Sequence, residues 1–202
     1  MHMTETDRNQ VLKLVRETGL VRVRDVRACG LHPEHLRRLV ADGLVERIAR
    51  GVYAPADIEP TPNHSLAQAA KKVPHGVVCL LSALRFHEIG TQSPFEVWLA
   101  IDRRARKPNL RAPKLRIVRF SGAALTAGVE RRHIEGVEVP VYSVAKTVAD
   151  CFKYRNKIGL DVALEALREG LRSRRFTRDE LWEHAKVCRV ASIMRPYLES
   201  MA

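Results

Sequence analysis

The stretch LHPEHLRRLVADGLVERIARGVYA, residues 31–54, holds a helical pattern, a turn and two short alternating runs in direct succession. Pro33 suits the first position of a helix, because the amide hydrogen that proline lacks would have no partner there. Gly43 stands where a residue of left-handed conformation commonly ends a helix. Residues 44–48 and 51–54 form the two alternating runs, which predict a β-hairpin.

The helix predicted after Pro33 has one apolar face and one charged face. Three apolar side chains lie at the spacing of a helical stripe: Leu36, Leu39 and Val40. The remaining surface carries Glu34, His35, Arg37 and Arg38, and the hairpin carries Arg47 and Arg50 near its tip. A helix with exposed arginines followed at once by a basic hairpin is the arrangement of a recognition helix and its wing. We therefore expect this stretch to be a DNA-reading unit.

The residues before this stretch predict two more helices with a short strand between them. We expect a helix from about Asp7 to Gly19, a strand at residues 20–23 and a helix at residues 25–29. Three helices and a hairpin in this order outline a winged helix-turn-helix. The alternative is a small three-helix bundle whose hairpin has no role in binding. Three arginines of this region are expected to fix the register on backbone phosphates: Arg22, Arg24 and Arg27.

The positive charge of the chain is unevenly distributed. The 202 residues have a formal net charge of +12. Residues 1–58 hold 10 basic and 8 acidic side chains, whereas residues 59–202 hold 25 basic and 15 acidic ones. The expected reading unit therefore contributes only +2 and the remainder +10. Such an excess favours a polyanionic partner, because Arg and Lys neutralise phosphates.

Two basic clusters account for part of this excess. The first follows Asp102, contains no acidic residue and comprises Arg103, Arg104, Arg106, Lys107, Arg111 and Lys114. The second comprises Arg172, Arg174, Arg175 and Arg178 at an expected turn between helices. Each cluster could be no more than a solvated surface. For residues 103–114 we favour contact with the phosphates of flanking DNA, which would make binding strongly salt-dependent.

The second half of the chain predicts a mixed domain. Helices are expected at residues 65–73, 79–89, 143–154, 161–171, 177–187 and 190–199, and strands at residues 95–101, 115–120, 131–134 and 137–142. Residues 57–63 are rich in proline and polar side chains, as in a linker. We therefore expect an α+β chain with a winged helix-turn-helix at residues 1–56, a linker at residues 57–63 and a C-terminal domain at residues 64–202. That domain would have a small antiparallel or mixed sheet of about four strands and a helical tail.

Other classes of protein find little support in the sequence. No apolar run is long enough to cross a membrane and no leader precedes a cleavage site, so we expect a cytoplasmic protein. The scattered cysteines predict neither a disulfide framework nor a zinc ribbon, and Cys79 and Cys151 are expected to be buried free thiols. No phosphate-binding loop or hydrolase motif is present, so no cofactor is expected. The alternative that stays open is a Mg²⁺-dependent nuclease, with carboxylates drawn from Glu96, Asp102, Glu135 and Glu138.

Four segments together resemble a known family. They are ADGLVERIARGVYAPA (41–56), LLSALRFHEIG (80–90), SPFEVWLAI (93–101) and VPVYSVAKTVADCFKYRNKIGLDVALEAL (139–167). Their order and spacing resemble the AbiEi family, which comprises antitoxins and transcriptional regulators of type IV toxin–antitoxin (abortive-infection) systems. The run SVAKTVADC is the most specific part of this resemblance.

The resemblance implies a function without catalysis. Such proteins repress their own operon by binding inverted repeats in its promoter, and they counteract a nucleotidyltransferase toxin without forming a stable complex with it. The C-terminal domain of the family is associated with antitoxicity and assists DNA binding. For this chain we therefore expect double-stranded operator DNA as the partner, bound by a monomer or weak dimer, with no metal and no catalytic residue.

Overall fold

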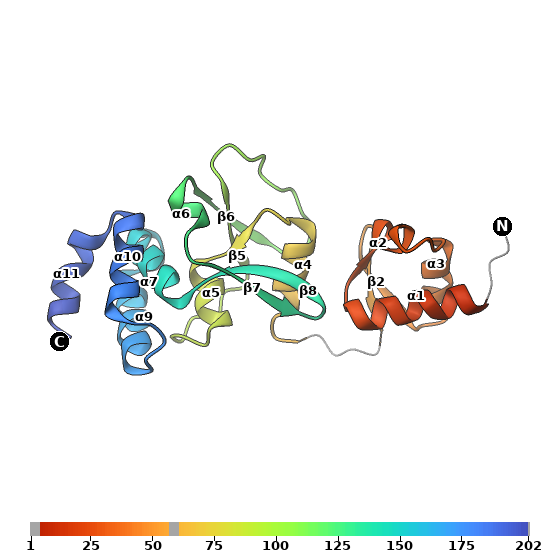
Figure 1. Cartoon of the computed structure of the whole chain (residues 1–202), viewed down its shortest axis with the longest axis horizontal. Coiled ribbons are helices and arrows are strands. Elements are labelled where there is room, and N and C mark those ends of the chain that lie inside the picture. Colours follow the sequence, from red (N-terminus) through yellow and green to blue (C-terminus); the bar gives the residue numbers. More distant parts are fainter. Residues whose placement is uncertain (1–4, 57–60, 202) are drawn as a thin grey trace. The chain divides into compact units, whose positions relative to one another are not determined.

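The computed structural model describes residues 5–56 and 61–201, and the chain divides into two compact units. The first unit comprises Met1–Lys72 and His133–Glu138, and the second comprises Val73–Arg132 and Val139–Ala202. Residues 57–60 of the expected linker lie outside the described residues. The chain has an α+β fold with helices and sheets in both units (Figure 1).

The first unit contains three helices and a small antiparallel sheet before residue 57. Its elements are α1 (Glu5–Thr18), β1 (Val21–Arg22), α2 (Val23–Ala28), α3 (Glu34–Ala41), β2 (Val45–Ala49) and β3 (Val52–Pro55), followed by α4 (His64–Lys72). The strand order is β1-β3-β2, with β3 antiparallel to both neighbours. The helices and strands predicted before residue 57 are all present, with bounds shifted by a few residues. A two-residue β1 forms because Val21 and Arg22 pair with β3.

Local chemistry explains the α3–β2–β3 segment. Gly43, after α3, has φ +70° and Gly51, between the two strands, has φ +72°, so both occupy a conformation that glycine adopts without steric cost. Between the helices and the strands lies an apolar core built mainly of valine and leucine. Its fully buried members include Val11, Val15, Val26, Leu36 and Leu39.

The larger sheet has five strands rather than the four that were predicted. They are β4 (Val77–Val78), β5 (Val97–Asp102), β6 (Leu115–Phe120), β7 (Val129–Ile134) and β8 (Val137–Tyr142), in the order β6-β5-β4-β8-β7. The sheet is mixed, because β4 runs antiparallel to β5 but parallel to β8, and β5 runs parallel to β6. The predicted tight turn between β7 and β8 is confirmed, since Glu135 and Gly136 both have positive φ.

Helices pack around this sheet and extend beyond it. They are α5 (Leu80–Phe86), α6 (Ala123–Thr126), α7 (Val144–Lys153), α8 (Arg155–Ile158), α9 (Leu160–Arg172), α10 (Arg178–Cys188) and α11 (Ala191–Glu199). Figure 1 shows α9 and α10 beside α7, with α11 at the C-terminal end of this helical group. The short helices α6 and α8 were not predicted. The predicted capping of α10 is confirmed: the Glu180 N–H donates to Thr177 Oγ1, and the Thr177 N–H donates to Glu180 Oε2.

The apolar core of the second unit lies mainly around α7. Every residue of α7 from Val144 to Phe152 is buried, and aromatic side chains such as Phe120 and Tyr142 pack in the same core. Cys79 and Cys151 are buried free thiols as predicted. Within the part of the chain that the structure describes, no helix combines the length and apolar character needed to cross a membrane.

Candidate nucleic-acid interface

The exposed face of α3 carries two arginines next to each other. Arg37 and Arg38 are both exposed, and Arg38 lies in the last turn of the helix. Arg37 Nη1 lies 3.5 Å from Glu34 Oε2, an i,i+3 ion pair on the helix surface. An exposed pair of this kind contributes little to stability, but it limits the directions in which the Arg37 guanidinium can point.

The buried face of α3 is displaced from the predicted one. His35 is buried at 1% exposure, whereas Val40, expected in the apolar stripe, is 36% exposed. On a helical wheel with 100° per residue, His35 lies about 40° from Leu39 and Val40 lies about 40° from Leu36, so the two residues flank the apolar stripe symmetrically and the periodicity alone does not decide which of them is buried. The prediction that His35 lies on the surface and can contact phosphate was wrong. Both ring nitrogens of His35 are buried and have no hydrogen-bond partner among the described residues.

The hairpin after α3 presents the two predicted arginines to solvent. Arg47 is exposed on β2, and Arg50 is exposed at the turn between the strands. Arg47 is paired with Tyr53 of β3, and the pairing shifts register between Arg47 and Ala49. Such an irregularity bends the strand and increases its twist, and here it lies directly before the turn that carries Arg50.

The three arginines expected on phosphates have different surroundings. Arg24 and Arg27 are exposed, and Arg24 Nε lies 3.6 Å from Asp25 Oδ1. Arg22 is only partly exposed, and its Nε is buried without a hydrogen-bond partner among the described residues. Burial, and next the charge of Arg24, lower the pKa of Arg22. Arg24 and Arg27 are therefore better placed than Arg22 for contact with a ligand.

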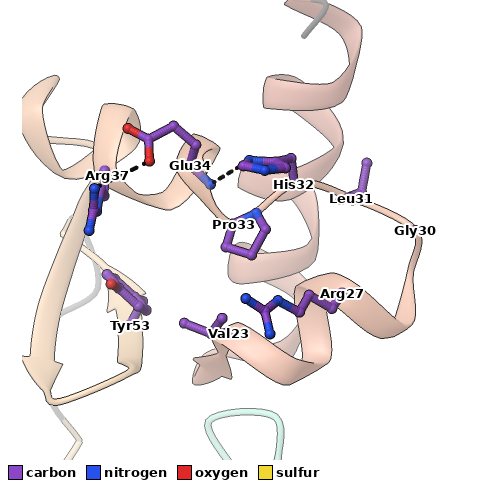
Figure 2. A pocket seen from close by; sticks show the side chains of 9 residues that line it. All are labelled: Val23, Arg27, Gly30, Leu31, His32, Pro33, Glu34, Arg37 and Tyr53. Atoms are coloured by element: carbon purple, nitrogen blue, oxygen red, sulfur yellow. Dashed lines mark hydrogen bonds and ion pairs between the residues drawn. The ribbon is translucent and has the colours of Figure 1, made fainter. Parts of the chain in front are cut away.

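A hollow of about 510 Å³ lies where α2, the turn after it, α3 and β3 meet. Figure 2 shows Arg27 from α2 and Arg37 from α3 at different sides of it, together with Tyr53 from β3. Its other lining residues are Val23, Gly30, Leu31, His32, Pro33 and Glu34. The Glu34 N–H donates to His32 Nδ1 at 3.2 Å, so His32 satisfies one amide in the first turn of α3. The hollow thus combines two guanidinium groups with an apolar wall.

In the second unit, the basic segment 103–114 is a crossover between two parallel strands. It joins β5 to β6, which are parallel and in register from Val97↔Leu115 to Asp102↔Phe120. The segment must therefore return along the whole strand pair, roughly 17 Å at about 3.3 Å per residue. Figure 1 shows it as an arc that stands out from the sheet. Its six basic residues, Arg103, Arg104, Arg106, Lys107, Arg111 and Lys114, are all exposed.

The second basic cluster is partly structural. Arg175 Nη1 donates to His87 O at 3.1 Å. Arg178 donates to two carbonyl oxygens near the C-terminal end, Leu198 O at 3.3 Å and Met201 O at 2.7 Å. These two guanidinium groups connect elements of the second unit and are not simply solvated.

The acidic residues considered for a metal site have separate roles. Glu96 Oε1 lies 3.5 Å from Arg116 Nη1, and Asp102 Oδ1 accepts the N–H of Arg104 at 2.7 Å. Although burial alone would raise it, the pKa of Glu135 is lowered because its carboxylate accepts hydrogen bonds from Thr61 and His64. Within residues 5–56 and 61–201, no three His, Cys, Asp or Glu side chains gather as a metal-binding group.

Sequence reasoning missed Arg119, which lies next to the crossover. Its guanidinium donates to carbonyl oxygens of Asp102, Arg103 and Ala105. The alternation places Arg119 on the strand side of Leu115 and Ile117, but this side chain is exposed, so the pattern did not require a polar partner for it.

The chain is similar to a known protein family and to a solved structure. Residues 9–56, about a quarter of the chain, match the family described as transcriptional regulator, AbiEi antitoxin. This match confirms the resemblance over that segment, which includes α2, α3 and the β2–β3 hairpin. No curated protein matches the chain. The crystal structure of the RV2827C protein from Mycobacterium tuberculosis is similar with a TM-score of 0.58 at 15% identity, over 92% of this chain and 73% of that one. At this identity the likeness concerns the fold alone.

Proposed function

We propose that this chain is a DNA-binding transcriptional regulator of the AbiEi antitoxin type, and that residues 5–56 form a winged helix-turn-helix. In this proposal α2 and α3 are the helix-turn-helix, α3 is the recognition helix, and the β2–β3 hairpin is the wing. The observation that carries the proposal is the pair of exposed arginines on α3, directly followed by a hairpin with exposed Arg47 and Arg50. The family match at residues 9–56 supports it independently.

The exposed side chains of α3 would read sequence in the major groove. Arg38 has the freedom for a bidentate contact with guanine O6 and N7, which discriminates bases by roughly 1–3 kcal/mol. Arg37, oriented by Glu34, would contact an adjacent base or phosphate. Arg47 and Arg50 on the wing would contact the backbone or the minor groove. Arg24 and Arg27 would fix the register on phosphates.

The basic crossover would supply affinity without sequence preference. Its length of roughly 17 Å corresponds to about five phosphates of one strand at about 3.4 Å of helix axis each. The first unit, with little net charge, would choose the sequence, and residues 103–114 would hold flanking DNA. This division requires that both units can contact one duplex.

The AbiEi resemblance extends the proposal to a biological role. The chain would act in the cytoplasm as the antitoxin of a type IV system, repress its own operon at inverted repeats and oppose a nucleotidyltransferase toxin without a stable complex. It would bind the repeats as two monomers or a weak dimer and would catalyse no reaction.

The test is a mobility-shift and footprinting experiment on DNA from upstream of the reading frame. We expect a retarded complex and protection of two related half-sites. Both should persist in an excess of unrelated duplex. Equal binding to unrelated duplex would contradict a sequence-specific regulator. Incubation of the labelled DNA with the protein and Mg²⁺ tests the nuclease alternative: intact, shifted DNA supports the regulator, and progressive cleavage supports the nuclease.

A further inference from the structure

The crossover at residues 103–114 is firmly attached to the sheet at the end where it leaves β5. The Arg103 N–H donates to Phe120 O at 2.8 Å, and the Ala105 N–H donates to Asp102 O at 3.1 Å. The side chain of Asp102 turns back to accept the Arg104 N–H at 2.7 Å. These bonds fold residues 102–105 into a tight turn that continues from the strand.

Arg119 adds side-chain hydrogen bonds to this turn. Its Nη1 atom donates to Asp102 O at 2.9 Å and to Arg103 O at 3.3 Å, and it also donates to Ala105 O. One guanidinium group therefore holds three carbonyl oxygens of the segment that carries the first basic residues. A guanidinium suits this task because it is permanently charged, and the two hydrogens of Nη1 are shared among the three carbonyl oxygens.

The rest of the crossover is held less tightly. At its far end the Val97 N–H donates to Lys114 O at 2.9 Å. For residues 106–111 the structure describes no backbone hydrogen bond. The order of the segment is therefore concentrated at residues 102–105, next to the densest cluster of its cations.

We propose that Arg119 is a positioning residue for polyanion binding: it holds the turn at residues 102–105 so that Arg103, Arg104 and Arg106 meet successive phosphates together. This inference rests on the proposed function, because it assumes that the crossover contacts DNA. Without Arg119 the segment would have to be ordered during binding, and part of the affinity would be lost to that ordering.

Substitutions of Asp102 distinguish an effect of positioning the turn from an effect of removing one negative charge. Asp102→Asn and Asp102→Ala remove the same negative charge, but only asparagine keeps an oxygen that can accept the Arg104 N–H. If charge alone mattered, both variants would bind a labelled duplex of random sequence equally and more tightly than the wild type. Positioning predicts that Asp102→Ala binds more weakly than Asp102→Asn, by a factor on the order of three to ten.

Arg119 itself is tested by a double-mutant comparison in the full-length chain. Arg119→Ala is measured alone and in a background with Arg103, Arg104 and Arg106 all replaced by Ala, with fluorescence anisotropy at several salt concentrations. We expect Arg119→Ala to weaken binding on the order of tenfold alone and to have no further effect in the neutralised background. A direct phosphate contact by Arg119 would instead lower the salt slope by about 0.9 in both backgrounds and would overturn the inference.

Failure of the inference and failure of the proposed function give different results. If the variant with Arg103, Arg104 and Arg106 replaced by Ala binds duplex as tightly as the wild type, the crossover does not contact DNA. That result overturns both the proposed role of the crossover in affinity and the positioning role of Arg119. If this triple variant binds more weakly but Arg119→Ala does not, only the positioning role is overturned. Should Arg119→Ala fail to fold, Arg119→Met replaces it: methionine keeps much of the apolar side chain but has no N–H donor, so binding at wild-type strength would contradict positioning. Amide exchange of Arg104 and Ala105 in the free protein should accelerate in either variant.

Discussion

Lys146 and Asp150 form an ion pair inside the core of the second unit, with Lys146 Nζ 2.6 Å from Asp150 Oδ2 and exposures of 0% and 1%. The two residues are one turn apart on α7. Lys146 Nζ also lies 4.1 Å from the centre of the Tyr142 ring and 4.9 Å from that of Phe120. The second carboxylate oxygen of Asp150 accepts a hydrogen bond from Cys188 Sγ at 3.1 Å. Each group therefore has partners inside the core, although neither reaches solvent.

Removal of one member of this pair should destabilise the second unit strongly. Lys146→Met would leave an uncompensated buried carboxylate, and Asp150→Leu an uncompensated ammonium, at a cost of about 3–5 kcal/mol each. The double variant Lys146→Met/Asp150→Leu removes both charges, and we expect it to recover most of the lost free energy of unfolding. Urea denaturation followed by tryptophan fluorescence measures this, because Trp98 and Trp182 both lie in the second unit. Additive losses in the double variant would show that the two side chains do not depend on each other.

Acid should destabilise the second unit through His87. This side chain is buried, its Nε2 lies 2.7 Å from Tyr142 O, and burial lowers its pKa from 6.5. The unfolded chain then binds a proton at a higher pH than the folded one, so the contribution to stability is complete above pH 6.5 and is lost as the pH falls below it. Burial lowers the pKa of His184 as well, with the same sign.

We therefore expect the urea midpoint to fall between pH 7 and pH 5, and His87→Gln to reduce that slope without abolishing it, because His184 remains. The matched control is His75→Gln, which replaces an exposed histidine of the same unit and should leave the slope in place. A slope unchanged in His87→Gln would exclude His87 as its source.

Much of the first unit could be predicted because its signals are local. Gly43 and Gly51 occupy positive φ where the sequence indicated a helix end and a hairpin turn. Arg37, Arg38, Arg47 and Arg50 are exposed as expected. Each of these features depends on residues within a few positions of one another, so the pattern contains the information that the fold uses.

The features that escaped prediction depend on residues far apart in the chain. β4 consists only of Val77 and Val78, which alone have no strand periodicity and are defined by pairing with β5 and β8. Without β4 the parallel arrangement of β5 and β6 could not be inferred, so the path of residues 103–114 back along the strands was not predicted. The contacts of Arg119 could not be predicted, because residues 102–105 lie next to it only through the parallel pairing of β5 and β6.

His35 should be replaceable by an apolar residue with a gain in stability. Neither ring nitrogen has a hydrogen-bond partner among the described residues, and an unsatisfied buried polar group costs about 1–3 kcal/mol. We expect His35→Leu to slow amide exchange at Leu36 and Leu39 of α3 by about tenfold, if roughly 1.4 kcal/mol is gained. DNA affinity should not change, since His35 is buried. A loss of affinity equal to that of Arg38→Ala would restore a role for His35 in contact with DNA.

Arg38 and Arg104 should affect DNA binding in different ways. Arg38 is exposed on α3, which the proposed function places against base edges, whereas Arg104 is exposed on the crossover, which it places against phosphates. Arg38→Ala should reduce the preference for the operator over unrelated duplex by roughly 1–3 kcal/mol. Arg104→Ala should weaken both duplexes alike and lower the salt slope by about 0.9.

The measurement is a titration of operator and unrelated duplex with each variant at several salt concentrations. Arg168→Ala is the matched control, because it removes an exposed arginine from α9 and should change neither specificity nor the salt slope. An equal loss of specificity in Arg38→Ala and Arg104→Ala would contradict the division of labour between the two units. If Arg38→Ala lowered the salt slope and left specificity intact, α3 would be a phosphate contact, and base recognition would have to lie on the hairpin.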